Sequence, residues 1–329
     1  MRRLDVAFDA RRTSHMSVGM QQYARELADR IPRVAPDISF ATFGQGDNFD
    51  WDEQVGMPLW IAKAAPRLVH VPSPYGPLLI PAPYVVTIHD VIDLHYPQWT
   101  KPRARWYYRA VVRRLARRAR CVITDDDVTA EDIRHFYGVP AERIAVIPLG
   151  VDAADVRPAS HPKPYAIYAG NRRAHKDLGT LVEAWRRVDS ARELDLVLTG
   201  SPDAALASAQ RMAGQIVFLG DLDHAAVLRW IAGAAVLAHP ALREGFGLPL
   251  LEAAKLGVPV VACDDAIPSP LRGLVRSFPA GDADAMARAL ELALDDRTRE
   301  LERRARAVAD ELTWDRCAAQ TAGVYRRYL

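Results

Sequence analysis

Two carboxylates, Glu244 and Glu252, stand on either side of a glycine-rich turn within residues 239–262. The turn between them consists of Gly245, Phe246, Gly247 and Leu248. Because Pro249 suits the first turn of a helix, the glycines should precede a helix N-terminus, whose free N–H groups and dipole attract anions. Each carboxylate can accept two hydroxyl hydrogen bonds, so this spacing predicts a site for a diphosphate with a sugar on each side. The alternative interpretation makes Glu252 a helix-dipole acid and Glu244 a solvated loop residue.

Three cations, Arg172, Arg173 and Lys176, follow a predicted strand at residues 165–169. In a parallel sheet the carboxyl ends of the strands meet at one edge, which would set these cations opposite the Glu244 turn. Guanidinium and ammonium groups bind phosphate oxygens strongly, so the three side chains are candidates for holding a diphosphate. A basic surface loop is the alternative.

His89 and Asp90 directly follow another predicted strand, at residues 84–88. Ligands of open parallel sheets bind beyond the carboxyl ends of strands, so His89 is a candidate functional residue, with a structural histidine as the alternative. Gly19 begins a predicted helix after a polar loop. The chain has no GxGxxG pattern there, so this glycine alone does not establish a phosphate site.

Residues 97–120 form the most basic segment, with nine Lys or Arg residues and no acid. Wound as a regular helix, the segment gathers apolar side chains from Ala104 to Ala119 on one face. The opposite surface, called the basic face below, carries Arg103, Trp106, Arg109, Arg113 and Arg117. Three uses fit it: an anionic membrane surface, a phosphate-bearing lipid acceptor, or plain solvation with Trp106 packed on arginine stems.

The composition is that of a globular protein of 329 residues, 50% hydrophobic and 26% charged, which accommodates two domains. The 43 basic and 41 acidic residues nearly cancel, so we expect no nucleic-acid partner. Three widely spaced cysteines favour a reducing compartment over a disulfide framework or a zinc site. The first ten residues turn polar too early for a signal peptide, and no run approaches the roughly 18 apolar residues of a membrane span. We therefore expect a cytoplasmic protein, with any membrane contact peripheral and at the inner face.

Strands and helices alternate on both sides of a proline-containing linker at residues 153–164. This pattern predicts an α/β protein with two doubly wound parallel-sheet domains, which we place at residues 1–155 and 156–312. Within the first domain, residues 44–58 are rich in Trp, Gly and Pro and form a turn-rich region.

Three segments match the Asp-x-Asp pattern of metal-dependent transferases, at residues 125–127, 221–223 and 282–284. Such short matches arise easily in a chain with this many acids, and an acid before a helix is ordinary capping. We therefore expect no metal and no cofactor beyond the substrate, and a metal-dependent transferase remains a rival hypothesis.

Taken together, these motifs resemble glycosyltransferase family 4. The resemblance covers nearly the whole chain and rests on five segments: DARRTSHMSVGMQQYARELA, VTIHDVIDLHYP, GNRRAHKDL, FLGDLD and EGFGLPLLE followed by LGVPVVA. It implies a GT-B fold, in which two Rossmann-like doubly wound parallel-sheet domains face each other across a cleft. The first would be the acceptor side, the second would hold the nucleotide-sugar donor, and residues 313–329 would form a helix crossing back to the first domain.

The resemblance also implies roles for individual residues. Glu244 would lie by the transferred sugar and Glu252 would hold the ribose hydroxyls, while Leu222 would meet the nucleobase. The N–H groups from Gly245 to Leu248 would contact sugar and diphosphate.

The remaining roles concern the diphosphate and the acceptor side. Lys176 would grip the diphosphate, Gly19 would face the donor, and His89 would approach the sugar or the acceptor, which makes His89, Lys176 and Glu244 the catalytic candidates. Many members have Arg where this chain has Asn171, so whether Arg172 or Arg173 grips the diphosphate stays open. Pro270 stands where members often have an acid.

The implied activity is transfer of a hexose from a nucleotide diphosphate sugar to a saccharide or lipid-linked acceptor, with retention of anomeric configuration. The His175–Lys176 pair matches mannosyltransferase-like members, which favours GDP-mannose as donor. Assembly of surface polysaccharide, lipopolysaccharide or glycolipid is the implied setting. A nucleotide-sugar epimerase and a non-catalytic nucleotide-sugar-binding paralogue are the alternatives.

Overall fold

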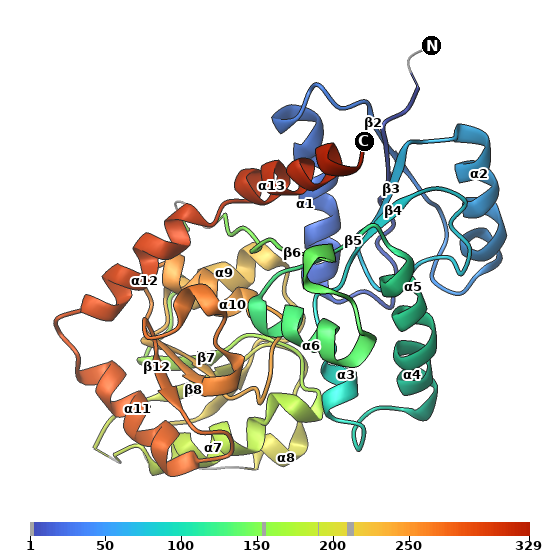
Figure 1. Cartoon of the computed structure of the whole chain (residues 1–329). Coiled ribbons are helices and arrows are strands. Elements are labelled where there is room, and N and C mark those ends of the chain that lie inside the picture. The colour runs from blue at the N-terminus through green and yellow to red at the C-terminus, as the bar shows by residue number, and fades with distance from the viewer. Residues whose placement is uncertain (1–2, 153–155, 190, 209–213) are drawn as a thin grey trace. The chain divides into compact units, whose positions relative to one another are not determined.

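The chain folds into two compact units (Figure 1). The computed structural model describes residues 3–152, 156–189, 191–208 and 214–329. The first unit comprises Met1–Gly150 together with Leu312–Leu329, and the second comprises Val151–Glu311. The predicted boundary at residue 155 lies outside the described residues.

The first unit is built on a six-stranded parallel sheet in the order β2-β1-β3-β4-β5-β6. Its strands are β1 (Val6–Asp9), β2 (Phe40–Phe43), β3 (Leu68–Val71), β4 (Tyr84–Thr87), β5 (Cys121–Thr124) and β6 (Ile144–Val146). The four central strands are buried along their whole length, which is why they are mostly continuous apolar runs in the sequence.

Helices connect these strands. They are α1 (Val18–Val34), α2 (Met57–Ala64), α3 (Ile92–His95), α4 (Pro102–Tyr107), α5 (Arg113–Arg118) and α6 (Asp127–Tyr137), with the short helices η1 (Asp52–Gly56), η2 (Tyr108–Val112) and η3 (Ala141–Arg143). The helix α1 begins where Ser17 accepts a hydrogen bond from the Met20 N–H. Gly19 therefore lies in the first turn of α1.

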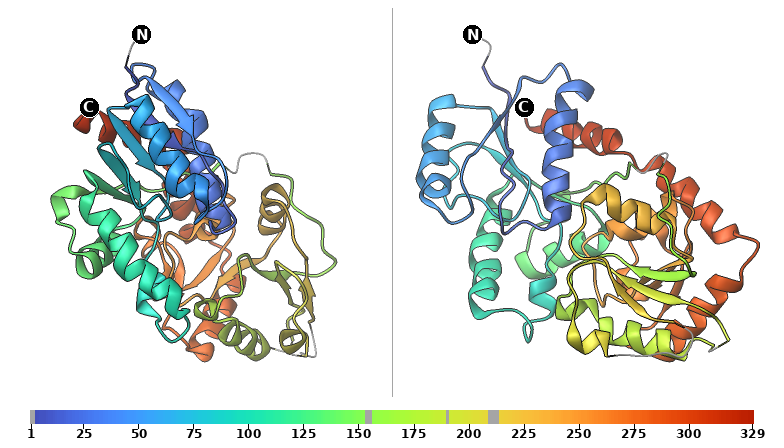
Figure 2. Two further views of the ribbon diagram at one scale, coloured as in Figure 1. Left: turned by 90° about the vertical axis from the view of Figure 1, so that its right-hand side faces the viewer. Right: turned by 180° about the vertical axis from the view of Figure 1, so that it is seen from behind.

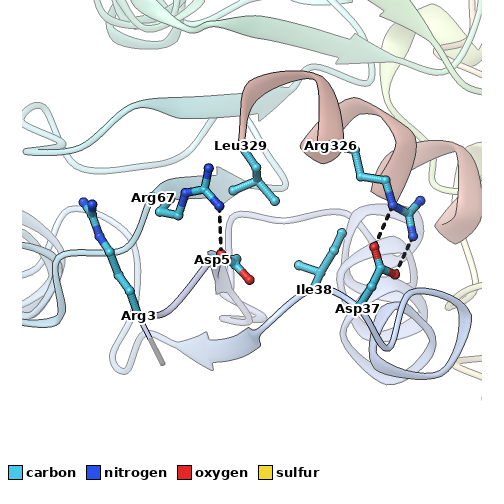
Figure 3. Close-up of a pocket in the computed structure, with 7 residues that line it drawn as sticks. All are labelled: Arg3, Asp5, Asp37, Ile38, Arg67, Arg326 and Leu329. Carbon is cyan, nitrogen blue, oxygen red and sulfur yellow. Dashed lines mark hydrogen bonds and ion pairs between the residues drawn. The ribbon is translucent and has the colours of Figure 1, made fainter. Parts of the chain in front are cut away.

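The last helix, α13 (Trp314–Tyr328), packs against α1 of the first unit (Figures 1 and 2). Tyr325 reaches the sheet, where its hydroxyl lies 2.6 Å from Nδ1 of the buried His70. Near the chain end, Arg326 donates to both carboxylate oxygens of Asp37 at 2.9 and 2.7 Å. Figure 3 shows this ion pair at the rim of a cavity of about 410 Å³, in which the arginines drawn are engaged by carboxylates or by a backbone carbonyl.

The second unit repeats the plan, with a six-stranded parallel sheet in the order β12-β11-β10-β7-β8-β9. Its strands are β7 (Tyr165–Tyr168), β8 (Asp195–Leu198), β9 (Ile216–Phe218), β10 (Val236–His239), β11 (Val260–Cys263) and β12 (Arg276–Phe278). The strand order reverses between β7 and β10, and this is the place where doubly wound sheets bind ligands.

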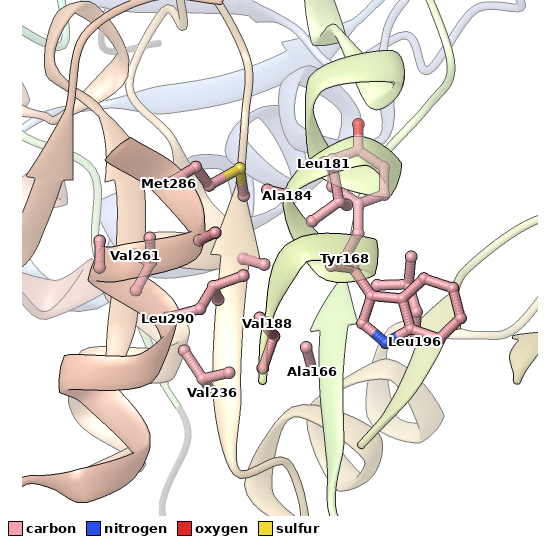
Figure 4. Close-up of a cluster of buried hydrophobic side chains, with 14 of the residues drawn as sticks. Ala166, Tyr168, Leu181, Ala184, Val188, Leu196, Val236, Val261, Met286 and Leu290 are labelled. Atoms are coloured by element: carbon pink, nitrogen blue, oxygen red, sulfur yellow. The ribbon is translucent and has the colours of Figure 1, made fainter. Parts of the chain in front are cut away.

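The connecting helices of the second unit bury an apolar core against this sheet. They are α7 (Leu178–Arg187), α8 (Ala204–Ala207), α9 (His224–Ala232), α10 (Leu248–Lys255), α11 (Ala283–Asp295) and α12 (Glu300–Glu311), with the short helices η4 (Ala174–Lys176), η5 (Asp264–Ala266) and η6 (Ser269–Leu271). Figure 4 shows Leu181 of α7 and Met286 and Leu290 of α11 packed over strand residues such as Val261. The expected α/β class with two doubly wound parallel sheets is confirmed.

Candidate functional site

The loops that follow β7 and β10 bring Lys176 and Glu244 together at the carboxyl edge of the second sheet. The ammonium nitrogen Nζ of Lys176 donates to Oε1 of Glu244. Only 9% of the Lys176 side chain and 14% of the Glu244 side chain are exposed. The two residues are 68 positions apart in the sequence. They meet because β7 and β10 are neighbouring strands, whose following loops lie at the same edge of the sheet.

His239, the last residue of β10, contacts the same carboxylate. Its Nε2 donates to Oε1 of Glu244 at 2.7 Å, and its ring stacks over Tyr168 with centroids 6.0 Å apart. The ring is 1% exposed, and its Nδ1 has no hydrogen-bond partner among the described residues. His239 was not predicted as a site residue, although it ends a strand just as a candidate at a sheet edge should.

These two neighbours determine the charge of Glu244. Burial alone raises the pKa of a carboxyl group, but the nearby charge of Lys176 and the hydrogen bond from His239 outweigh it. They hold the pKa of Glu244 well below its usual range. Glu244 is therefore an anion at neutral pH, and its second oxygen, Oε2, has no hydrogen bond to any described residue.

Glu252 lies in α10, the helix that follows the glycine-rich turn. Gly247 caps this helix with φ of 77°, a backbone conformation that glycine adopts without strain. Glu252 is 4% exposed, and its Oε1 accepts a hydrogen bond from Nε2 of His224 at 2.6 Å. Since His224 begins α9, this contact ties the start of α9 to the middle of α10. His224 was not predicted from the sequence.

The two arginines after β7 lie differently from Lys176. Arg172 donates to the backbone carbonyls of Thr199, at 3.0 Å, and of Ser201, and its guanidinium lies 5.0 Å from the ring centre of Phe218. Arg173 is exposed. Neither hydrogen-bonds Glu244. Leu222 is half-buried in the loop between β9 and α9.

In the first unit, His89 follows β4 and is 6% exposed. Its Nδ1 lies 2.5 Å from Oδ2 of Asp125, and its Nε2 lies 3.2 Å from the carbonyl oxygen of Pro72. A carbonyl oxygen only accepts, so Nε2 carries a proton. Burial lowers the pKa of His89, but the Asp125 carboxylate outweighs it and raises that pKa. Burial also raises the pKa of Asp125, and the nearby His89 charge counters it only in part. One proton therefore lies between Nδ1 of His89 and Oδ2 of Asp125.

Two family models match this chain. The model described as Glycosyltransferase Family 4 matches residues 17–155, and the model described as Glycosyl transferases group 1 matches residues 163–296. The chain belongs to glycosyltransferase family 4. It is therefore a transferase, and the expected GT-B fold is confirmed by solved glycosyltransferases of similar structure.

Among its relatives, the O-antigen chain mannosyltransferase B of Escherichia coli is 28% identical over 74% of this chain and 70% of that protein. The MMP alpha-(1->4)-mannosyltransferase of Mycolicibacterium hassiacum is 30% identical over 74% of this chain and 65% of that protein. The structure of Anabaena HepE in complex with UDP and glucose is similar with a TM-score of 0.73, at 16% identity, and covers 99% of this chain and 100% of that chain.

The three Asp-x-Asp segments of this glycosyltransferase each supply a helix cap. Asp126 accepts from the Val128 N–H, and Asp223 and Asp282 cap α9 and α11 in the same way. Asp125, in the first segment, is the partner of His89. Capping and ion pairing therefore account for five of these acids, Asp125, Asp126, Asp223, Asp282 and Asp284.

The basic segment forms a continuous helical stretch from α4 through η2 to α5. All five residues of the basic face are exposed, and Trp106 is 64% exposed. The regular helix assumed from the sequence was wrong in its middle, because η2 is a π-helix. The extra residue in a π turn rotates the following residues, so Ala116 is buried although the regular pattern did not place it there. None of the described helices is long and apolar enough to cross a membrane.

Proposed function

We propose that this glycosyltransferase transfers mannose from GDP-mannose, with retention of configuration, to a saccharide or lipid-linked acceptor in the synthesis of surface polysaccharide or glycolipid. The observation that carries the proposal is the buried cluster of Lys176, His239 and Glu244 at the switch point of the second sheet. Two relatives named as mannosyltransferases support the choice of sugar.

The cluster suits the ground state and the transition state of such a transfer. Lys176 and the N–H groups at the start of α10 hold the diphosphate, whose negative charge grows as it leaves. Oε2 of Glu244 accepts hydroxyl hydrogen bonds from the sugar, while His239 keeps the carboxylate ionised and oriented when Lys176 turns to the phosphate. Glu252 accepts the ribose hydroxyls.

The chemical step is front-face attack. The bond between the anomeric carbon and the phosphate oxygen breaks first, and the acceptor hydroxyl bonds to that carbon on the face the diphosphate leaves. Its proton passes to the departing phosphate oxygen, so charge and atoms balance. Positioning and electrostatic stabilisation supply the rate, and His89 lines the acceptor side without acting as a general base, because both its ring nitrogens are engaged.

We further propose that the basic face meets an anionic membrane or a phosphate-bearing lipid acceptor. Leu78 and Leu79, in the loop between β3 and β4, are 61% and 63% exposed and line a small hollow with Arg114 and Arg118. Exposed leucines beside arginines match the boundary between acyl chains and headgroups.

A thermal-shift series with GDP, UDP, ADP and dTDP tests the donor site in the wild type and in Glu252→Ala. A nucleotide at 100 times its dissociation constant adds about 2.7 kcal/mol to the free energy of unfolding, so binding is visible. We expect GDP alone to stabilise the wild type, and Glu252→Ala to respond less. Glu193→Ala is the matched control, because that glutamate is 67% exposed.

Turnover of GDP-mannose with a mannobiose acceptor tests the reaction itself. We expect GDP release that depends on the acceptor, and a product whose proton NMR spectrum shows an α-linkage. A new nucleotide sugar formed without acceptor identifies an epimerase, and nucleotide binding without turnover identifies a non-catalytic paralogue. A β-linked product contradicts retention.

A further inference from the structure

A cavity of about 520 Å³ opens in the first unit beside the carboxyl ends of β1 and β2. It is lined by Ala10, which follows β1, and by residues between Thr42 and Trp60, the stretch rich in Trp, Gly and Pro. Carboxyl ends of parallel strands are where α/β sheets bind ligands. The residues at this end of β1 and β2 have no part in the donor site of the second unit.

One wall of this cavity is aromatic. The rings of Phe43, at the end of β2, and Trp60, in α2, stack in parallel with centroids 4.6 Å apart and an interplanar angle of 1°. Phe43 is 8% exposed, whereas Trp60 is 37% exposed. Because Phe43 holds the indole plane in place, the exposed part of Trp60 is a fixed apolar platform. Sugar rings present a face of C–H groups that packs on such a platform.

The rest of the lining includes three polar side chains, Thr42, Gln45 and Asp52. Each is exposed, and none of the three side chains forms a hydrogen bond with any other described residue. Together they offer a hydroxyl, an amide and a carboxylate, which suit the hydroxyl groups around a sugar ring. The lining contains one carboxylate and no cation, so it does not suit a phosphate or a nucleotide.

A buried ion cluster fixes the short helix η1, which begins at Asp52. Glu53 is 1% exposed and accepts from the guanidinium of Arg11 at 3.2 Å and from the Phe49 N–H at 2.6 Å. Arg11 in turn pairs with Asp9 at 2.8 Å. The pocket wall is therefore held in place before any ligand arrives, which reduces the entropy lost on binding.

Gly44 closes the bend after β2 and belongs to the same wall. Its φ is 98°, and a Cβ atom there would come within 2.7 Å of Oδ1 of Asp9. Only glycine fits this backbone without displacing the ion cluster.

We propose that this pocket binds a neutral sugar ring of the acceptor saccharide, stacked on Trp60 and hydrogen-bonded to Asp52 and Gln45. The identity of the sugar as an acceptor rests on the proposed function, whereas the binding of a neutral saccharide does not. The pocket would then select acceptors by the sugar ring that lies over the indole.

Saturation-transfer difference NMR tests the pocket with the wild-type chain and a panel of α-1,2-mannobiose, maltose and cellobiose. We expect ring C–H signals from at least one disaccharide. Trp60→Ala should weaken its binding roughly tenfold and Trp60→Phe should retain most of it. Trp51→Ala is the matched control, since Trp51 is 78% exposed and does not line the cavity.

Asp52→Asn is a second, independent test of the pocket, and it should also weaken disaccharide binding. The fold should tolerate this change, because an exposed side chain is replaced by one of nearly equal shape. The thermal shift with GDP reports whether each variant is folded and whether the donor site works. No signal from any disaccharide, or equal binding in wild type, Trp60→Ala and Asp52→Asn, overturns the pocket assignment. If GDP binds normally in that case, the pocket inference fails and the proposed transferase function stands. If GDP does not bind to the wild type, the proposed transferase function is contradicted instead.

Discussion

Lys176 and Glu244 form a nearly buried ion pair between the loops that follow two neighbouring parallel strands. Breaking a buried ion pair of this kind strongly destabilises a protein, because removal of one partner leaves the other charge poorly solvated. Its position at the switch point of the sheet makes it the centre of the proposed donor site. The stability and the pH dependence of the second unit should both respond to it.

Glu244→Gln should destabilise the chain at neutral pH by about 3 kcal/mol, because Lys176 then keeps a buried charge without a carboxylate. The folded-state pKa of Glu244 lies below its ordinary value of 4.5. Its ionic contribution is therefore present above about pH 4.5 and is lost as the pH falls towards the folded pKa. Urea unfolding at pH 7 and at pH 3 should show the penalty of Glu244→Gln shrinking in acid. An equal penalty at both pH values, or a similar effect of the exposed control Glu193→Gln, contradicts this account.

The variants Arg172→Ala and Arg173→Ala should distinguish a structural role from a role in binding the nucleotide sugar. Arg172 already donates to two backbone carbonyls, so its loss should lower the melting temperature of the chain. Arg173 is exposed, so its loss should leave the melting temperature unchanged and raise the KM for the nucleotide sugar. Differential scanning fluorimetry and donor titrations measure the two effects. If Arg172→Ala changes the donor KM and leaves stability untouched, Arg172 is the phosphate ligand.

Asp125→Asn should lower the pKa of His89. In the wild type Asp125 raises that pKa above 6.5, so protonation of His89 contributes stability below pH 6.5 that is lost as the pH rises through the folded pKa. Without the carboxylate, burial favours the neutral ring. The ¹⁵N chemical shifts of the His89 ring, followed against pH, check this directly. Asp127→Asn is the control, since Asp127 is exposed, and it should leave the pKa of His89 unchanged.

Charge reversal of Arg109, Arg113 and Arg117 to Glu should abolish sedimentation with liposomes that contain phosphatidylglycerol. Each Arg contributes about 1 kcal/mol near an anionic surface, so affinity should fall at least about a hundredfold. Reversal of Arg297, Arg304 and Arg306, which are exposed in the second unit, changes the net charge equally and should have little effect. Binding of the wild type to neutral phosphatidylcholine vesicles alone, or equal losses in both triple variants, argues against the basic face as the membrane contact.

Much of this protein could be predicted from the residue order alone. Continuous apolar runs indicated the buried parallel strands, and their alternation with helices around the proline-containing linker indicated two doubly wound sheets. The turn from Gly245 to Gly247 could be placed before α10, because glycine, proline and helix caps act over only a few residues.

Pairings between distant residues were decided by the tertiary structure. His239, His224 and Asp125 each face a candidate residue, yet none was predicted to do so, because the partner belongs to another strand or helix. Which loops meet depends on strand order, and strand order leaves no local pattern in the sequence. The π turn in η2 and the stacked rings of Phe43 and Trp60 likewise leave no local pattern in the sequence. Residue types state what chemistry is available, whereas packing of the whole sheet decides which groups come within hydrogen-bond distance.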